Sequence, residues 1–413
     1  MKEPKIRFKG FQGEWETRHV GELCDVLTGF PFEGSKILPK GKELLMRGIN
    51  ITEGFIRHSE DIDRYYDEDS SMLSKYRLQE NDLVIGMDGS KVGKNSALVT
   101  KKEVNSLLVQ RVARLRNNNP HLIHLIQISL GSEKFFEYVD SMKTSSAIPH
   151  ISPSDIKNFV VSISVNDDEI KLVSDYFQHL DSLIQSTTKK IESLKQVKAA
   201  SMQSMFPQEG ETTPRVRFKG FEGEWEKKTL GDCLTINNER NQSNVYGIND
   251  VLSVSDEVGV VNQIKLLGRS YAGKSVVNYR VLKTNQIVYT KSPLKSKPYG
   301  IIKVNKGDIG IVSVLYAVYD ANENVYPDYI HYYFEPIHRI NNYLLPLINK
   351  GAKNTMNISD EMALTGNIWI PSLEEQKKIA DYLQALDSQI TLQTQRLEKL
   401  KQIKAACLDN MFV

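Results

Sequence analysis

The sequence predicts an α+β fold: two mixed α/β modules separated by two long helices that form an antiparallel coiled coil, arranged as a pseudo-twofold internal duplication. Three observations predict it. RFKGFQGEWE begins at Arg7 and returns as RFKGFEGEWE at Arg217. A longer helical phrase begins at Ser174 and returns without a gap 206 residues later, at Ala380. The segments between these phrases contain short β-branched and aromatic runs, which are typical of strands.

The length of the chain indicates more than one domain. A chain of 413 residues exceeds what one core of ordinary size organises. We predict a first module over residues 1–165, a long helix over 166–206, a linker over 207–216, a second module over 217–371 and a second long helix over 372–413. The linker PQEGETTPRV is polar and contains two prolines, which suits a connection between domains.

The two long helices are predicted from apolar residues at alternating spacings of three and four. These residues are Ile170, Val173, Phe177, Leu180, Ile184, Ile191 and Leu194, and then Ile379, Leu383, Leu386, Ile390, Leu397 and Leu400. Such a stripe is typical of a coiled-coil seam. Thr187 and Gln393 interrupt it at equivalent positions, and they either fix the register or are merely tolerated. Each helix would be roughly 58 Å long, and antiparallel pairing would place the modules at opposite ends.

Composition and charge exclude several classes of protein. With 40% hydrophobic and 25% charged residues, the chain is expected to fold throughout. No apolar run reaches membrane-spanning length and none follows the basic start, so we expect a cytoplasmic protein without a signal peptide. Cys24, Cys233 and Cys407 form no CxxC pair, so we expect reduced thiols, no zinc site and no cofactor. The net charge of +2 permits nucleic-acid binding without requiring it.

Each module contains a strand-like run that enters a basic, hydroxyl-rich loop. NDLVIGMDGS begins at Asn81 and NQIVYTKSP at Asn285, and a second polar loop precedes each long helix. Side chains of this kind suit phosphates and base edges. The predicted DNA-binding residues are Ser90, Lys91, Lys94, Asn95, Thr144, Ser145, Ser146, Lys274, Lys291, Ser292, Lys295, Lys297, Lys353 and Asn354.

A further basic cluster follows in the first module. QRVARLRNN brings Arg111, Arg114 and Arg116 close together. For any single basic residue, an ordinary solvated side chain is the competing interpretation. The recurrence of basic loops in both modules favours binding.

One segment satisfies a nucleotide-binding pattern. GRSYAGKS, from Gly268 to Ser275, matches G-x-x-x-x-G-K-S. A working loop of this kind leaves a strand and opens a helix, whereas the residues that follow here are rich in β-branched and aromatic types. We therefore predict no nucleotide site there. The chain also lacks the F-x-G-x-G and N-P-P-[FY] elements of an adenine methyltransferase, so no catalytic residues are predicted.

The repeated F-x-G-F-x-G-E-W phrase and the tails DYFQHLDSLI…IESLKQVKAA and DYLQALDSQI…LEKLKQIKAA resemble the specificity subunit of type I restriction-modification enzymes. The resemblance covers essentially the whole chain. It implies that each module is a target recognition domain that reads one half of a split DNA sequence, and that the helices fix the distance between the halves. It implies as partners double-stranded DNA, two modification methyltransferase subunits and the restriction/translocase subunits, with no membrane and no chemistry of its own.

Two other functions remain open from the residues alone. A coiled-coil adapter would share the helices and the duplication but lack DNA specificity. An autonomous enzyme would need to bind ATP or S-adenosylmethionine. The aromatic residues of the repeated phrase are expected to pack where a module meets the helices, since a phrase that reads bases would not stay constant while targets differ. These residues are Phe8, Phe11, Trp15, Phe218, Phe221 and Trp225.

Overall fold

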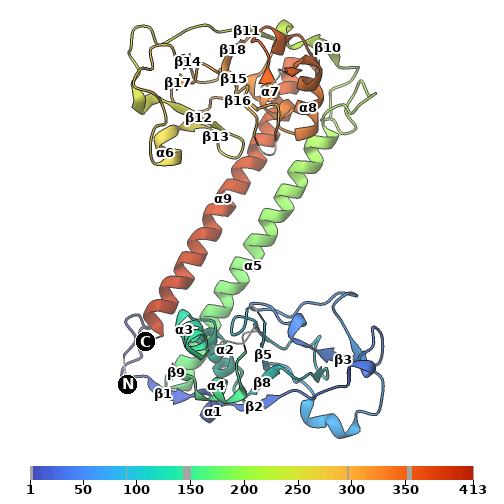
Figure 1. Ribbon diagram of the computed structural model, residues 1–413, viewed down its shortest axis with the longest axis vertical. Coiled ribbons are helices and arrows are strands. Elements are labelled where there is room, and N and C mark those ends of the chain that lie inside the picture. Colours follow the sequence, from blue (N-terminus) through green and yellow to red (C-terminus); the bar gives the residue numbers. More distant parts are fainter. Residues whose placement is uncertain (1–2, 90, 143–149, 295–296, 351–355, 413) are drawn as a thin grey trace. The chain divides into compact units, whose positions relative to one another are not determined.

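A computed structural model describes residues 3–89, 91–142, 150–294, 297–350 and 356–412. The chain divides into two units, of which unit 1 contains residues 1–188 and 395–413 and unit 2 contains residues 189–394. Each unit combines a module of mixed helices and strands with one segment of each long helix, α5 (Asp167–Ser204) and α9 (Leu373–Met411) (Figure 1). The predicted α+β class is confirmed.

The module of unit 1 is built on a four-stranded antiparallel sheet. Its strands, in order across the sheet, are β2 (Asp25–Thr28), β8 (Val112–Arg116), β5 (Leu83–Gly86) and β6 (Ser96–Leu98). A second sheet joins β4 (Tyr65–Tyr66), β3 (Glu43–Met46) and β7 (Leu107–Leu108). Every residue of β5 is buried, because this inner strand is covered on both faces.

The module of unit 2 repeats this plan. Its four-stranded antiparallel sheet has the order β11 (Leu234–Ile236), β18 (Ala317–Ala321), β15 (Ile287–Tyr289) and β16 (Ile302–Val304). Four further strands form two antiparallel pairs, β12 (Leu252–Ser255) with β13 (Gly259–Asn262) and β14 (Arg280–Leu282) with β17 (Gly310–Val312). Another short pair joins β19 (Asn349–Lys350) and β20 (Met356–Asn357).

The same local signal introduces the inner strand of both sheets. Asn81 precedes β5 with φ of 69°, and Asn285 precedes β15 with φ of 65°. Asparagine tolerates this left-handed conformation better than most residues. The segments that begin with NDLV at Asn81 and with NQIV at Asn285 therefore form the same inner strand in the two modules, as their similar sequences indicate.

Each module is closed by a two-stranded pair next to a long helix. In unit 1 the pair is β1 (Glu16–His19) with β9 (Val160–Ile163), and in unit 2 it is β10 (Glu226–Thr229) with β21 (Asn367–Ile370). The shorter helices of unit 1 are α1 (Val20–Leu23), α2 (Pro120–Leu130), α3 (Glu133–Met142) and α4 (Pro153–Asn158). Those of unit 2 are α6 (Gln263–Leu267), α7 (Pro327–Phe334) and α8 (Ile337–Leu344).

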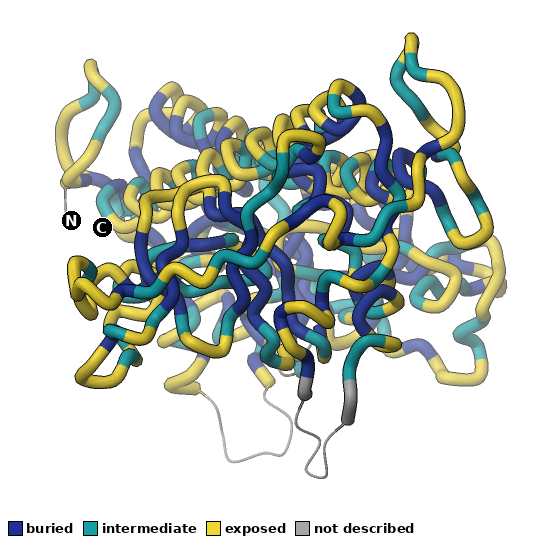
Figure 2. The backbone as a smooth tube through the Cα atoms, turned by 90° about the horizontal axis from the view of Figure 1, so that it is seen from above, coloured by how far each residue is buried: buried dark blue, intermediate teal, exposed yellow. Residues whose placement is uncertain are grey.

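Both cores include the ends of the long helices. Buried and exposed stretches alternate along the chain (Figure 2), and the inner strands β5 and β15 are buried throughout. Phe177 of α5 is fully buried in the core of unit 1, and Phe206, just beyond α5, is fully buried in the core of unit 2. Leu383 of α9 is likewise fully buried in unit 2.

The two helices run antiparallel within each unit. In unit 1, Lys404 of α9 binds Asp181 of α5 at 2.5 Å, and Tyr176 contacts the Cys407 thiol at 3.6 Å. In unit 2, the equivalent Lys198 of α5 binds Asp387 of α9 at 2.7 Å, and Ser201 contacts Tyr382 at 3.4 Å. Higher residue numbers on one helix pair with lower numbers on the other, as antiparallel helices require. Each of these contacts in unit 1 has an equivalent contact in unit 2.

The two interruptions of the seam differ in exposure. Thr187 is buried, whereas Gln393 is half-buried. The seam residues nearest the modules, such as Val173 and Leu383, are fully buried, while Ile184 and Ile390 are only partly covered. Burial of the stripe is therefore strongest where a module also packs on it.

The repeated ten-residue phrase attaches each module to a helix start. The Arg7 guanidinium donates to both carboxylate oxygens of Glu169, at 2.7 and 2.8 Å, and Arg217 binds Glu375 at the same two distances. Both glutamates lie in the first turn of their helices, where the helix dipole favours negative charge. The phrase thus has the same structural task in both units.

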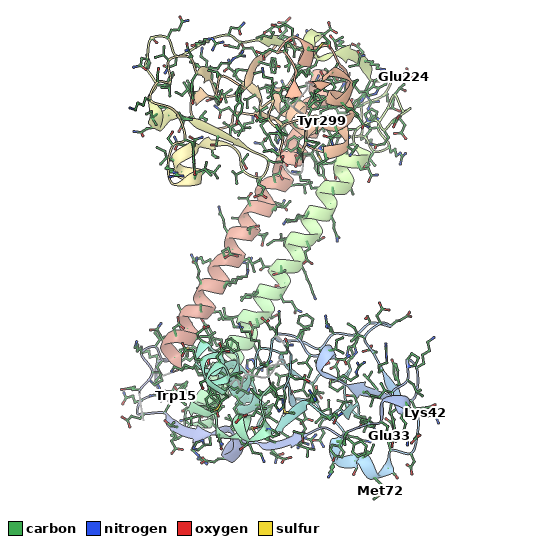
Figure 3. The ribbon with its side chains drawn as sticks, in the orientation of Figure 1. Trp15, Glu33, Lys42, Met72, Glu224 and Tyr299 are labelled. Atoms are coloured by element: carbon green, nitrogen blue, oxygen red, sulfur yellow. The ribbon has the colours of Figure 1, made fainter. Side chains whose placement is uncertain are left out.

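The aromatic residues of the phrase pack at this junction. Trp15 lies beside the helix ends of unit 1 (Figure 3), with its ring 5.7 Å from that of Phe412 and its indole N–H donating to Glu169 at 3.3 Å. In unit 2, the Trp225 ring lies 6.2 Å from that of Phe206. Both tryptophans are buried, as expected for residues with a structural role.

Candidate nucleic-acid interface

A groove on the module of unit 1 gathers basic and amide side chains at the ends of its strands. It has a volume of about 440 Å³. Its lining comprises Arg47, Gly48, Ile49, Asp88, Gly89, Lys91, Asn95, Val109, Gln110 and Arg111. The end of β3 contributes the first of these residues, the loop after β5 the next group, and the turn between β7 and β8 the last three.

The turn that carries Arg47 is fixed by a buried asparagine. The side-chain carbonyl of Asn50 accepts from the Arg47 backbone at 3.3 Å, and its amide donates to Asp63 at 2.9 Å. Asn50 is almost fully buried. One wall of the groove is therefore held rigidly, as a reading surface requires.

Arg111 stands on the opposite turn with its side chain in solvent. Its side chain is 62% exposed, and its Nη1 donates to the Asp88 carboxylate at 3.1 Å. Its φ is 68°, a left-handed conformation that arginine rarely adopts. The Arg111 carbonyl accepts from the Met87 amide at 3.0 Å, which ties the turn to the end of β5.

The other two arginines of the predicted basic cluster point inward. Arg114 is buried and pairs with Asp25. Arg116 donates twice to the buried Asp82 carboxylate at 2.6 Å. The two residues are separated by one position on β8 and so project from the same face of the sheet. Of these three arginines, Arg111 is the one that faces solvent.

The predicted residues of the first loop lie in or beside the groove. Lys91 is exposed and binds Glu53 at 2.9 Å, and Asn95 is half-buried in the lining. Lys94 is exposed, with its ammonium 4.7 Å from the centre of the Phe136 ring. Loosely paired surface lysines of this kind remain available to a phosphate.

Two of the predicted lysines of unit 2, Lys291 and Lys297, have internal partners. Lys291 binds the buried Asp360 carboxylate at 2.5 Å, and the same carboxylate accepts from Arg280 at 2.6 Å. Burial alone would raise the pKa of Asp360, but hydrogen bonds from Lys291 and Arg280 outweigh it and lower this pKa. Ser292 is half-buried beside them.

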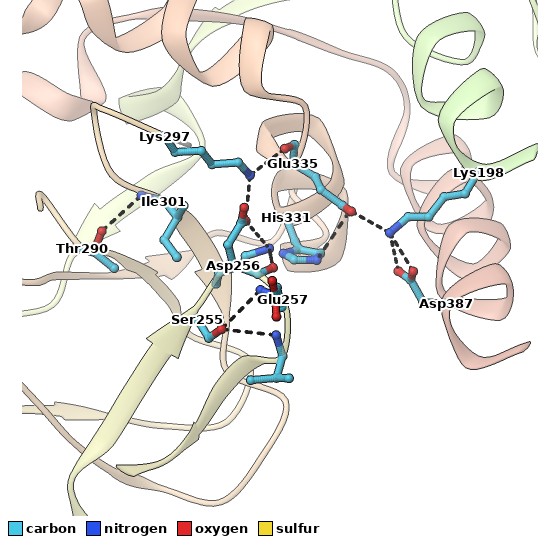
Figure 4. A network of polar contacts seen from close by, with 12 residues as sticks. Lys198, Ser255, Asp256, Glu257, Thr290, Lys297, Ile301, His331, Glu335 and Asp387 are labelled. Atoms are coloured by element: carbon cyan, nitrogen blue, oxygen red, sulfur yellow. Dashed lines mark hydrogen bonds and ion pairs between the residues drawn. The ribbon is translucent and has the colours of Figure 1, made fainter. Parts of the chain in front are cut away.

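Lys297 is a buried structural lysine in this conformation. Its ammonium donates to Asp256 and to the Glu335 carbonyl, both at 2.8 Å (Figure 4). Its side chain is only 4% exposed. We therefore do not place Lys297 on DNA. Its observed role is to hold the loop that contains Tyr299 against the end of α7.

The exposed basic segment of unit 2 is instead the one that matches the nucleotide-binding pattern. It follows α6 rather than preceding a helix, and the next regular element is the strand β14. Lys274 is exposed, and the Arg269 guanidinium lies 4.7 Å from the ring centre of the exposed Tyr271. The Gln263 side chain accepts from the Tyr271 amide at 2.7 Å and orders the segment. A basic, aromatic loop of this kind suits a nucleic-acid backbone.

The remaining predicted residues lie outside the described residues. They are Ser90, Thr144, Ser145, Ser146, Lys295, Lys353 and Asn354.

A second hollow, in unit 2, has the wrong charge for DNA. Its volume is about 460 Å³. Glu222, Glu224 and Glu226 line it together with Arg217 and Lys228. Three carboxylates repel phosphate, so this hollow beside the repeated phrase is not a nucleic-acid site.

Two kinds of site are absent from the part of the chain that the structure describes. No group of three or more His, Cys, Asp or Glu residues there is placed to hold a metal ion. Among the same residues, no helix has both the length and the apolar composition needed to cross a bilayer.

Sequence reasoning overlooked part of the groove and part of the exposed loop. Asp88, Gln110 and Arg47 have no repeat or pattern that distinguishes them from ordinary loop residues. Arg269 and Tyr271 did have a signal, since they lie in a glycine-rich stretch already singled out for another reason. A basic residue two positions from an exposed tyrosine is a pattern that could have been recognised.

Comparison with known proteins identifies the fold and the family. Residues 12–196 and 222–402 each match the family described as "Type I restriction modification DNA specificity domain". The EcoAI specificity subunit of a type I restriction enzyme from Escherichia coli is 28% identical over 178 residues, which are 42% of this chain and 29% of that protein. A second relative comes from Methanocaldococcus jannaschii and is assigned as the specificity subunit of the type I restriction enzyme MjaX. It is 22% identical, and the alignment covers 95% of this chain and 91% of that protein.

A solved structure shares the fold over the full length. The crystal structure of the type I restriction-modification system S subunit from M. genitalium has a TM-score of 0.61 and 14% identity. The match covers 100% of this chain and 99% of that one. The predicted resemblance to this group of proteins is confirmed.

Proposed function

We propose that this chain, which belongs to the type I restriction-modification DNA specificity family, reads a two-part DNA target, one half with each module. The helix pair sets the distance between the two halves. The chain performs no chemistry itself and presents DNA to methyltransferase subunits, two of which dock on equivalent surfaces, and to the restriction subunits that join them.

The observation that carries this proposal is an internal duplication whose two parts have diverged unequally. The attachment of module to helix is repeated in detail, as in Arg7 with Glu169 and Arg217 with Glu375. The exposed basic surfaces differ: unit 1 has a groove, and unit 2 has the loop around Tyr271. A constant scaffold with two different readers supports recognition of two different half-sites.

Charge and hydrogen-bonding capacity divide the proposed contacts into two kinds. Lys91 and Lys94 in unit 1 and Lys274 in unit 2 are exposed point charges that suit phosphates. Asn95 and Gln110 line the groove and have amides that pair with base edges. Phosphate contacts give affinity for any duplex, whereas the groove residues discriminate between sequences.

The lengths of the helices support their role as a spacer. α5 has 38 residues and α9 has 39. At 1.5 Å per residue each is about 57 Å long, which exceeds the 34–36 Å between successive major grooves on one face of a duplex. A rod of this size has room for a module at each reading position.

The direct test is to sequence methylated DNA from a host that carries this chain with its methyltransferase subunits. We expect one motif made of two short specific halves separated by a fixed number of unspecified base pairs. A continuous motif, or methylation without sequence preference, would overturn the proposal. Sequence-independent binding by the assembled complex would instead support the adapter function.

A further inference from the structure

We infer that Arg111, held in place by Asp88, reads a guanine in the half-site bound by the module of unit 1. This inference rests on the proposed function and adds a residue and a base to it. Guanine is the base whose major-groove edge carries two adjacent acceptors, O6 and N7, and the guanidinium fork is the side chain that matches them.

The first step is that the Arg111 side chain can reach a ligand, whereas those of Arg114 and Arg116 are held by internal partners. The side chain of Arg111 is 62% exposed, while that of Arg114 is 3% exposed and pairs with Asp25. Arg116 is committed to the buried Asp82. The turn between β7 and β8 thus directs one arginine of the three into the groove.

The second step is that Asp88 uses only part of the guanidinium. Arginine has five N–H donors in one plane. Asp88 accepts from Nη1 at 3.1 Å, and within the described residues Nε and Nη2 have no protein partner. The carboxylate therefore limits rotation of the plane and leaves two parallel donors for a base. Asp88 is itself half-buried and paired through its backbone with His150, so its position is fixed.

The third step is that the backbone holds Arg111 in an unfavourable conformation. A φ of 68° brings the Cβ of an arginine close to the following carbonyl oxygen, and the surrounding structure must offset this strain. Glycine or asparagine would adopt this turn more easily. An exposed arginine at a position that suits glycine indicates that the side chain is needed there.

The lysine of the same groove provides the contrast. Lys91 is 63% exposed and pairs with Glu53 across the surface. An ammonium is a compact charge without a fork, so it suits a phosphate and reads a base edge less specifically than a guanidinium does. We therefore expect replacement of Arg111 to change which DNA sequence is bound, and replacement of Lys91 to change the affinity for every sequence.

The test uses the full chain in complex with its methyltransferase subunits and duplexes that contain the methylated motif. Each guanine of the motif is replaced in turn by 7-deazaguanine, which removes the N7 acceptor and keeps base pairing. For the unaltered complex, we expect one replacement to weaken binding by about tenfold, because the guanine keeps O6 but loses N7 and the bidentate contact becomes a single hydrogen bond. In Arg111→Ala, the same replacement should have no further effect.

Two more variants keep the test decisive if Arg111→Ala folds poorly. Arg111→Lys retains the charge and should lose the sensitivity to that one replacement. Asp88→Asn removes the charge that restrains the guanidinium and should reduce, rather than abolish, the sensitivity. Lys91→Ala is the matched control: it should weaken binding to every duplex and lower the salt dependence, with the response to 7-deazaguanine unchanged.

The outcomes separate this inference from the proposed function. If the unaltered complex shows no preference for the motif, the proposed function itself fails. If the preference is present but Arg111→Ala and Arg111→Lys keep the full response at every guanine, only the assignment of Arg111 is overturned. Loss of response at a single guanine in both variants supports it.

Discussion

At the scale of single residues, an ion pair with two hydrogen bonds joins the repeated phrase to the helix start. Glu169 is fully buried, and the side chain of Arg7 is 12% exposed. Burial alone would raise the pKa of Glu169, but hydrogen bonds from Arg7 and Ser164 and the charge of Arg7 lower it below its ordinary value of 4.5. Replacing one partner leaves a buried charge without its counterion.

We expect Glu169→Gln to reduce the free energy of unfolding of the chain by about 3 kcal/mol at neutral pH. A lowered pKa in the folded state stabilises the protein above pH 4.5, and this contribution is lost as the pH falls through the lowered pKa. The difference between variant and unaltered protein should therefore shrink below pH 4.5. Urea unfolding monitored by tryptophan fluorescence at several pH values measures it.

The matched control is Glu22→Gln, which removes the exposed partner of Arg18. We expect it to leave the unfolding curve within experimental error, because exposed ion pairs contribute little. Equal effects of the two substitutions would contradict the special role of the buried pair.

Single residues also show how far the sequence predicts the site. Glu169 and Glu375 stand 206 residues apart, like the repeated tails, and the arginines they bind stand in the repeated phrase. This pairing was therefore open to prediction from the repeats. The burial of Lys297 was not, because its partners Asp256 and Glu335 come from distant segments that no local pattern connects to it.

At the scale of elements, one lysine connects both long helices to the module of unit 2. Lys198 of α5 binds Asp387 of α9 at 2.7 Å and Glu335, which follows α7, at 2.6 Å (Figure 4). Burial opposes the charge of Lys198, but the two carboxylates outweigh it and raise its pKa. The equivalent Lys404 in unit 1 binds Asp181, and the pair is more exposed.

This difference predicts unequal effects of equivalent substitutions. Lys198→Ala should reduce the free energy of unfolding by about 2 kcal/mol, since it leaves two partly buried carboxylates side by side without a cation. Lys404→Ala should cost less than about 1 kcal/mol. Urea unfolding of both variants gives the comparison, and a larger effect of Lys404→Ala would contradict this account of the network.

The elements also differ in how well their sequence indicates them. The long helices were predictable because their apolar stripe recurs over many turns and the structure buries it, most fully at Val173 and Leu383. The short strands of the modules were only partly predictable. The pair of β14 with β17, for example, depends on contacts between segments far apart in the sequence rather than on the three residues of each strand.

At the scale of the whole molecule, the duplication gives the two long helices equivalent midpoints. Thr188 and Thr394 are separated by the same 206 residues as the repeated tails, and the boundary between the units follows each of them. An insertion after both residues therefore changes the two helices equally. Seven residues preserve the 3.5-residue period of the seam.

We expect such a double insertion to lengthen the unspecified gap in the methylated motif while leaving both specific halves unchanged. Each helix gains about 10 Å, which is the length of about three base pairs. Sequencing of methylated DNA from the host reports the gap and the half-sites together. Insertion into one helix only shifts its seam against the other and should abolish methylation at either spacing. If the double insertion leaves the original gap, the helices do not act as the spacer, because the readers then keep their separation without them.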